Sequence, residues 1–288
     1  MTIFSTAHFI LNSLAIHFQV SVISFIISTL NDYVIFVPML LFGFLAEYID
    51  GALGMGFGVT SSSLILAIGV APAIVSASVH TAKVFTTFFA SISHWKFGNI
   101  RKDIAVPLIT PGIIGGIIGA VLISYTPSQA TKPVIALFLF LVGFIIFLRY
   151  LVRKNVLVVE KPISKSGLTA LGFVAAFCDA AAGGGWGPIA TPSLMMTNKS
   201  EPRKVIGSVD ASEFFIAITQ TITFLIILGP ETFQWSWILA LLIGGAVAAP
   251  LAAYTCKKVP SRWLGLLIGV ILIVSNLITL LKIVGIVN

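Results

Sequence analysis

The sequence predicts an all-helical polytopic membrane protein that is built from two inverted repeats and begins with an extra N-terminal helix. Three observations predict this fold class. The chain of 288 residues is 58% hydrophobic and only 9% charged, which is too little polar cover for a water-soluble surface. Apolar runs of about 20 residues recur, whereas a membrane barrel would show alternating segments of ~10 residues. The second half of the chain also repeats the order of segments found in the first half.

The distribution of charge predicts the location of the protein. Of the 17 Lys and Arg residues, 14 lie in four loops at residues 96–102, 149–165, 199–204 and 257–262. Basic loops of this kind stay on the cytoplasmic side of a membrane. The net charge of +7 therefore reflects orientation in a bacterial-type cytoplasmic (inner) membrane, and we expect no nucleic-acid partner. Cys178 and Cys256 lie far apart and show no metal-ligand spacing, so we expect no metal site and no cofactor.

The elements of the first half follow from apolar length. Residues 8–30 are apolar but lack the basic start and cleavage site of a signal peptide, so residues 1–33 are predicted to hold a retained transmembrane helix. Repeat 1, residues 34–152, opens with an apolar segment at 36–68. One helix of this length would measure ~50 Å against a hydrocarbon core of ~30 Å, so the segment must be broken. Helices are predicted after it at residues 72–95, 104–125 and 133–151.

The second half presents the same order after a basic linker at residues 153–166, which we expect in the cytoplasm. Repeat 2, residues 167–288, opens with a long segment at 167–197, and helices are predicted at 203–228, 235–254 and 262–287. Several pairs match between the repeats: Gly43-Phe44 with Gly172-Phe173, Ser78-Val79 with Ser208-Val209, and Gly115-Gly116 with Gly244-Gly245. Such duplication is the usual construction of secondary transporters.

The loop charges also predict how the two long segments run. With all four basic loops in the cytoplasm, the segment at 167–197 begins and ends on one side and must turn back inside the membrane, at Gly183–Pro188. The segment at 36–68 would turn likewise at Gly54–Gly58, open to the outside. Each repeat is then one re-entrant hairpin plus three spanning helices. Because three crossings end on the opposite side of the membrane, the second repeat starts from the other face and is inverted relative to the first. The alternative, nine ordinary spans, would place two basic loops on opposite faces.

Glycine-rich sequences at both turns form the first part of the predicted site. Asp50, Gly54, Gly56 and Gly58 correspond, 129 positions later, to Asp179, Gly183, Gly185 and Gly187. Helix N-termini inside a membrane present free backbone N–H groups, which suit a small anion. The residues expected to bind the substrate there are Gly54, Gly56, Gly58, Thr60, Ser61, Gly183, Gly184, Gly185, Trp186, Gly187 and Thr191. The alternative is that these glycines only permit close packing of helices.

Charged side chains on the helix after each hairpin form the second part of the predicted site. His80 and Lys83 share one helix face, and their repeat counterparts are Asp210 and Glu213. Lys83 lies ~16 Å along its helix, near the middle of the membrane, where a charge is costly unless paired or beside a wet cavity. We expect His80 and Lys83 to bind the anion and the opposite charges at equivalent positions to be partners. Coupling or structural roles are expected for Asp50, Asp179, Asp210 and Glu213. A purely structural Lys83–Glu213 ion pair is the alternative.

The duplicated hairpins resemble those of the sulfite exporter TauE/SafE family of membrane permeases. The resemblance rests on Gly43-Phe44 with the glycines after Asp50, and on Gly172-Phe173 with the glycines after Asp179. The basic linker and the length also fit, from about residue 34 to the end of the chain. The resemblance implies a secondary transporter that exports a small anion such as sulfite, an organosulfonate or a related organic acid.

Two other functions compete with anion transport. The membrane-embedded carboxylates could instead serve a cation transporter. An intramembrane enzyme is a weaker alternative, because the chain has no paired histidines at i, i+4 and no nucleophile elbow, so we expect no catalytic residue. The expected partners are the anion, the lipid bilayer, a coupling proton or cation, and further copies of the chain in a homo-oligomer.

Overall fold

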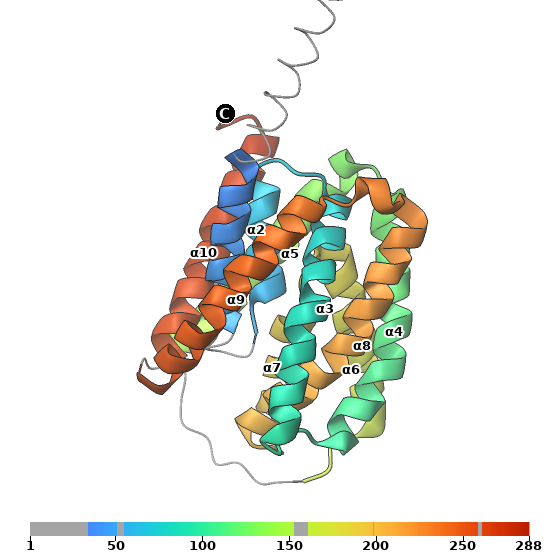
Figure 1. Cartoon of the computed structure of the whole chain (residues 1–288), viewed down its shortest axis with the longest axis vertical. Helices are drawn as coiled ribbons and strands as arrows, with labels where there is room; N and C mark the ends of the chain where they lie inside the picture. The colour runs from blue at the N-terminus through green and yellow to red at the C-terminus, as the bar shows by residue number, and fades with distance from the viewer. Residues whose placement is uncertain (1–33, 51–54, 153–160, 198, 259–260, 288) are drawn as a thin grey trace, which may run out of the picture. The chain divides into compact units, whose positions relative to one another are not determined.

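The computed structural model describes residues 34–50, 55–152, 161–197, 199–258 and 261–287, and within these ranges every regular element is a helix (Figure 1). Five segments are long and apolar enough to cross a membrane: α3 (Pro72–Lys96), α4 (Lys102–Tyr125), α5 (Ser128–Leu151), α8 (Pro202–Leu228) and Gly265–Ile283 of α10 (Ser261–Ile283). The predicted all-helical, multi-pass class is thereby confirmed. The helix predicted at residues 8–30 lies outside the described residues.

The remaining elements are shorter or are interrupted. They are a helix at residues 34–50, α2 (Phe57–Ala67), α6 (Lys165–Ala182), α7 (Trp186–Met196), the 3-10 helix η1 (Pro230–Thr232) and α9 (Trp235–Lys258). Helix boundaries fall close to the predicted ones, with three exceptions: α5 begins five residues before the expected position 133, α9 ends four residues after position 254, and α10 ends four residues before position 287. The apolar segment at 36–68 is interrupted at Met55 and Gly56, directly before α2, as its length required.

The break between α6 and α7 consists of three glycines, Gly183 to Gly185. Gly183 has φ 75°, in the left-handed region that favours glycine, and the turn ends before Pro188, which is already inside α7. Beyond the two helices, the backbone N–H of Lys161 donates to the carbonyl of Lys199 at 3.1 Å. The Arg101 guanidinium donates to the carbonyl of Lys161 at 3.4 Å and to that of Lys199 at 2.9 Å. Both ends of the broken segment therefore lie together, beside the loop between α3 and α4.

Helices at equivalent positions in the two halves pack in antiparallel pairs. Along α3, Lys83 pairs with Glu213 of α8, and the later His94 pairs with the earlier Asp210. Helices α5 and α10 are antiparallel too, because residue numbers rise along α5 while those of its contacts fall along α10. Gly143 contacts Leu272, Phe147 contacts Gly269, and Tyr150 contacts Gly265. Figure 1 shows α3 and α8 side by side. Each helix of these two pairs thus meets its own counterpart.

Glycines bring the helices of the two halves together elsewhere too. A Cβ on Gly115 of α4 would overlap the backbone of Phe173 in α6, and a Cβ on Gly244 of α9 would overlap the backbone of Leu40 and Phe44. Gly115 and Gly244 are counterparts, as are Phe44 and Phe173. The glycine-rich helix of each half therefore packs against the broken segment of the other half, where only a residue without a side chain fits.

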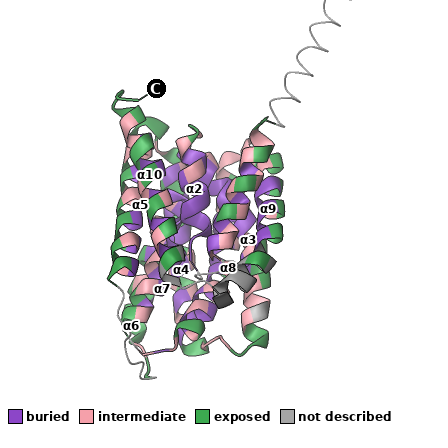
Figure 2. Ribbon diagram, turned by 90° about the vertical axis from the view of Figure 1, so that its left-hand side faces the viewer, coloured by how far each residue is buried: buried purple, intermediate pink, exposed green. Residues whose placement is uncertain are grey.

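Burial follows the arrangement expected in a bilayer (Figure 2). Leu108, Trp186, Val209 and Ile216 belong to one fully buried apolar cluster between α4, α6, α7 and α8. Outward-facing positions are apolar as well, including Ile145 and Ile226, which are 63% and 78% exposed. Large apolar surfaces of this kind belong against lipid rather than water.

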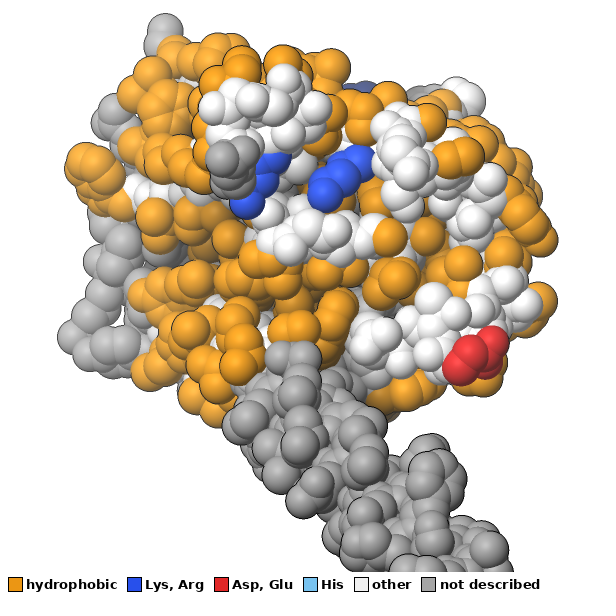
Figure 3. Space-filling view, turned by 90° about the horizontal axis from the view of Figure 1, so that it is seen from above, with side chains coloured by type: hydrophobic (Ala, Val, Ile, Leu, Met, Phe, Trp, Pro, Cys, Tyr) orange, Lys and Arg blue, Asp and Glu red, His pale blue; other side chains and the backbone are white. Residues whose placement is uncertain are grey.

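Two basic side chains meet at one end of the helices. Lys132 of α5 and Lys282 of α10 line a hollow of about 580 Å³ beside the last turn of α2. Figure 3 shows basic side chains among mainly apolar and uncharged groups at this end. Positive charge is favourable there because the carbonyl groups at the end of a helix carry negative partial charge.

Candidate functional site

Asp179 is the centre of the site. It lies in the last turn of α6, and its Oδ1 accepts hydrogen bonds from the backbone N–H groups of Gly185 at 2.8 Å and Trp186 at 3.1 Å. These are the first free donors of α7, so the carboxylate caps that helix and offsets part of the positive charge at its end. The three-glycine turn makes the contact possible, since Gly185 approaches the backbone of Asp179 closely.

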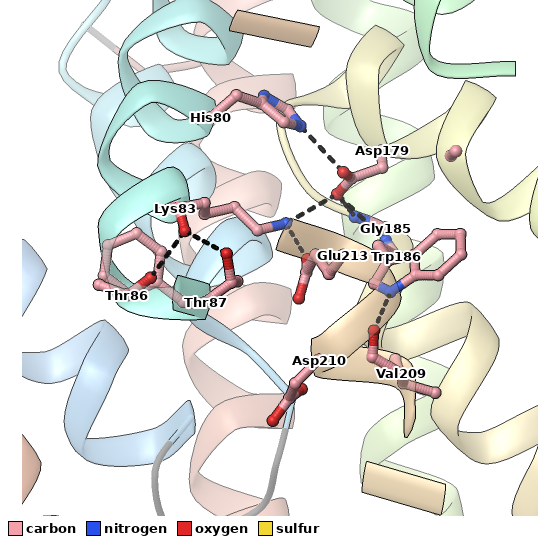
Figure 4. Close-up of polar contacts among 12 residues, drawn as sticks. His80, Lys83, Thr86, Thr87, Asp179, Gly185, Trp186, Val209, Asp210 and Glu213 are labelled. Atoms are coloured by element: carbon pink, nitrogen blue, oxygen red, sulfur yellow. Dashed lines mark hydrogen bonds and ion pairs between the residues drawn. The ribbon is translucent and has the colours of Figure 1, made fainter. Parts of the chain in front are cut away.

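Three further side chains donate to the same carboxylate, and Figure 4 shows two of them, His80 and Lys83. Lys83 Nζ lies 3.2 Å from Oδ1, His80 Nε2 lies 2.9 Å from Oδ2, and Gln220 Nε2 lies 3.3 Å from Oδ2. Asp179 is fully buried, and with five donors its negative charge is completely satisfied. Such a group is held rigidly and has little capacity left for another ligand.

Lys83 also forms the predicted ion pair with Glu213 of α8, so this prediction is confirmed. The Glu213 side chain is 10% exposed and that of Lys83 is 5% exposed. His80 and Asp210 do not form the second pair that the sequence predicted. His80 points to Asp179. Asp210, one helical turn before Glu213 on α8, lies 3.3 Å from Nε2 of His94, near the C-terminal end of α3. The antiparallel crossing explains the difference, because only residues at the crossing point can meet their own counterparts.

Lys83 and Glu213 face a narrow cavity of about 10 Å³. The free space admits little more than a water-sized sphere. Its lining comes from both broken segments and from α3 and α8: Asp50, Met55, Gly56, Phe57, Gly58, Val59, Lys83, Thr86, Thr87, Gly185, Gly187, Pro188 and Glu213. Four of these are glycines, which expose backbone to the cavity where other residues would fill it.

The first broken segment ends at the cavity in the same way as the second. Asp50 Oδ1 accepts a hydrogen bond from the backbone N–H of Phe57 at 3.1 Å, and this contact is the counterpart, 129 positions earlier, of the one between Asp179 and Trp186 at the same distance. The N-termini of α2 and α7 therefore both lie at the cavity and are both capped by a carboxylate. Gly58 and Gly184 bring the two segments into backbone contact.

The predicted substrate residues fall into two groups. Those that line the cavity are Gly56, Gly58, Lys83, Gly185 and Gly187, together with the charges Asp50 and Glu213. Those beside it or behind it are Thr60, Ser61, His80, Gly183, Gly184, Trp186, Thr191, Asp179 and Asp210. Gly54 lies outside the described residues.

Trp186 and the predicted hydroxyl residues Thr60, Ser61 and Thr191 are not part of the cavity lining. The Trp186 indole is fully buried in the apolar cluster and donates to the carbonyl of Val209 at 3.1 Å. Thr60, Ser61 and Thr191 are also fully buried, and none of their hydroxyl groups has a hydrogen-bond partner among the described residues. The aromatic ring therefore stabilises the packing of α7 on α8, and contact with a substrate is not needed to explain it.

Several residues of the site were missed from the sequence. Gln220 is seven positions after Glu213, hence two turns along the same face of α8, and this spacing could have identified it. Thr86 and Thr87 follow Lys83 by three and four positions, on the same face of α3. His94 gave no comparable signal, because its partner Asp210 was assigned to His80. Among the described residues, no group of three or more His, Cys, Asp or Glu side chains is arranged to hold a metal ion.

The known proteins that this chain is similar to are described as an exporter family and a membrane transporter. Residues 39–278 match the family described as "Sulfite exporter TauE/SafE". The chain is 45% identical, over 242 residues, to a protein of Bacillus subtilis (strain 168) named "Probable membrane transporter protein YtnM", and the match covers 83% of this chain and 81% of that protein. No solved structure matches the chain. A match that covers both broken segments, the buried charges and four of the five described candidate membrane spans in full identifies the chain as a membrane transporter of the TauE/SafE sulfite exporter family.

Proposed function

We propose that this protein is a secondary transporter that exports a small sulfur-containing anion, such as sulfite or an organosulfonate, or a related organic acid. The observation that carries the proposal is the position of Lys83. Its ammonium group lies near the middle of the apolar helix α3, in a cavity to which two helix N-termini are directed. A cation and helix N-termini at that depth suit an anion with several oxygen acceptors.

We also propose that residues 34–152 and 167–288 are inverted repeats that exchange access to the cavity. Gly58 touches Gly184, and their counterparts, Gly187 and Met55, touch each other as well. Reciprocal contacts of this kind indicate a two-fold relation between the halves. Because counterpart helices run antiparallel in the α3–α8 and α5–α10 pairs, the axis must be perpendicular to the helices. An axis in the membrane plane is what relates inverted repeats.

The orientation of the protein follows from its basic loops. Three of them, which contain Arg101, Lys161 and Lys199, are joined by hydrogen bonds at one end of the helices. Positive loops remain in the cytoplasm, so we assign this end to the cytoplasm and the end with Lys132 and Lys282 to the outside. The family description supports sulfite as a substrate, and the name of the Bacillus subtilis relative supports transport in general.

Flux through purified protein in proteoliposomes tests the proposal. We expect radiolabelled sulfite, methanesulfonate or sulfoacetate to leave loaded vesicles faster with the protein than without it. Replacing Lys83 by Ala should abolish this flux, whereas Lys165→Ala, at an exposed position, should leave it unchanged. No flux of any of these anions would refute anion transport. Retained anion-independent sodium or potassium flux in Lys83→Ala would favour the cation transporter instead.

A further inference from the structure

The two carboxylates bound to Lys83 differ in how firmly they are held. Asp179 is fully buried and receives five hydrogen bonds, from two backbone N–H groups and three side chains. Glu213 lines the cavity, and within the described part of the chain Lys83 is its polar partner. Asp179 is therefore a permanent ligand of the ammonium group, whereas Glu213 is the ligand that can be exchanged.

The charges around Lys83 are balanced. His80 places Nε2 2.9 Å from Asp179 Oδ2 and Nδ1 2.7 Å from the carbonyl of Ser76. The Ser76 hydroxyl already donates to the carbonyl of Ala180 at 2.5 Å, so both ring nitrogens face acceptors, as they do when each carries a proton. In that form His80 and Lys83 together offset Asp179 and Glu213, the two carboxylates that they contact. Asp50, which also lines the cavity, offsets the positive end of α2.

An anion that entered this neutral cluster would leave an uncompensated negative charge near the middle of the membrane, which is costly. It would also lack space, because the cavity is narrow and Glu213 already holds the side of Lys83 that faces it. Both obstacles disappear if the Glu213 carboxylate takes up a proton. The neutral acid releases Lys83, and one singly charged anion replaces the lost negative charge.

We infer that, in the absence of substrate, the Glu213 carboxylate occupies the position on Lys83 to which the anion binds. One proton, carried by Glu213, then accompanies each singly charged anion through the site. This inference rests on the proposed function. The balance is simple: a proton joins the Glu213 carboxylate as the anion pairs with Lys83, and on the other side the anion leaves as Glu213 loses the proton and pairs again. The charged and titratable groups that face Glu213 are Lys83 of α3, Asp179 of α6, Asp50 before α2, and Asp210 on its own helix.

A coupled carrier of this kind works in either direction, according to the sum of the anion and proton gradients. Movement of a sulfonate with a proton is electroneutral, so the membrane potential should not drive it. Export then requires that the outward gradient of the anion exceed the inward gradient of protons. The test can therefore use uptake or efflux, whichever gives the better signal.

The test uses the purified full chain in proteoliposomes with radiolabelled methanesulfonate, which stays ionised throughout the working pH range, so any coupled proton must travel on the protein. With the membrane potential clamped by potassium and valinomycin, an external pH one unit below the internal pH should drive accumulation of up to about tenfold. A pH-sensitive dye inside the vesicles should record one proton entering per methanesulfonate.

In Glu213→Gln the side chain is permanently neutral. We expect exchange of labelled for unlabelled methanesulfonate to continue, and the pH-driven accumulation to fall to the equilibrium level. Glu231→Gln, at an exposed position just after α8, is the matched control and should accumulate methanesulfonate as the unmodified protein does.

Three results would overturn the inference: accumulation by Glu213→Gln equal to that of the unmodified protein, loss of exchange in a folded Glu213→Gln protein, or anion flux in the unmodified protein without proton entry. If Glu213→Gln does not fold, the dye measurement on the unmodified protein decides alone. A protein that moves none of the tested anions would refute the proposed function instead, so the two failures are distinguishable.

Discussion

Gly58 and Gly184, which lie in opposite halves of the chain, are in backbone contact beside the cavity. A Cβ on Gly58 would lie 3.0 Å from the Cα of Gly184, and a Cβ on Gly184 would overlap the backbone of Gly58 and Val59. The contact joins the first turn of α2 to the turn between α6 and α7. Side chains on either residue would force the two broken segments apart, and the site is assembled from both of them.

Gly184→Ala should therefore destabilise the protein and reduce transport together. Overpacking of a tight contact costs about 1–3 kcal/mol, and separation of the two helix N-termini should lower the transport rate at least tenfold. Gly167→Ala is the matched control, because a Cβ there meets only Ser164, at an ordinary 3.8 Å. Thermal unfolding in detergent and methanesulfonate flux measure the two effects. Equal behaviour of the two variants would contradict the close contact.

Asp50 and Asp179 occupy equivalent positions but should differ sharply when changed to Asn. Asn still caps a helix well, so Asp50→Asn, which keeps an acceptor for Phe57, should cost less than about 1 kcal/mol. Asp179→Asn leaves Lys83 and His80 without the negative charge between them, and loss of one partner from a buried ion pair costs about 3–5 kcal/mol.

The yield of monodisperse protein and its unfolding temperature in detergent provide the comparison. We expect Asp179→Asn to be poorly folded or strongly destabilised, and Asp50→Asn to resemble the unmodified protein. Similar unfolding temperatures for the two variants would show that the five donors around Asp179 do not depend on its charge.

Trp186→Phe should affect stability without affecting recognition of the substrate. The change removes the hydrogen bond from the indole to Val209 and part of the ring that fills the apolar cluster, which should cost about 1–3 kcal/mol. The carbonyl of Val209 keeps a partner in the Ser212 hydroxyl at 2.8 Å. We expect the KM for methanesulfonate to change less than twofold. A tenfold higher KM in a protein of normal stability would mean that the ring contacts the substrate.

The sequence predicted the helices and the breaks well because both depend on local chemistry. Apolar length and glycine clusters mark where a membrane helix runs and where it stops, so the break before Trp186 could be predicted. The ion pair of Lys83 with Glu213 could be predicted as well, because duplication supplied the correspondence between helices that are distant in sequence.

The partners of the other charges depend on the crossing of α3 and α8, which is a tertiary property. His80 therefore could not be matched with Asp179, nor His94 with Asp210, from spacing alone. The orientation of a side chain about its helix is equally hidden, since Trp186 follows the glycine turn in sequence but points into the apolar cluster. A repeat predicts which backbones correspond, whereas contacts at the site also depend on residues that differ between the copies.

The route of the chain through the membrane can be tested by labelling single cysteines, in a protein in which Cys178 and Cys256 are replaced by Ala. Ser166 and Thr197, which flank α6 and α7, and Ser128, at the start of α5, are all exposed. Because Lys161 and Lys199 are hydrogen-bonded at the ends of the broken segment, Cys at 166 and 197 should react from the same side. In the proposed orientation that side is cytoplasmic, so we expect an impermeant thiol reagent added to intact cells to label Ser128→Cys only. Inverted membrane vesicles should reverse the pattern. Labelling of positions 166 and 197 from opposite sides would make α6 and α7 a complete crossing, and the halves could then no longer be inverted copies.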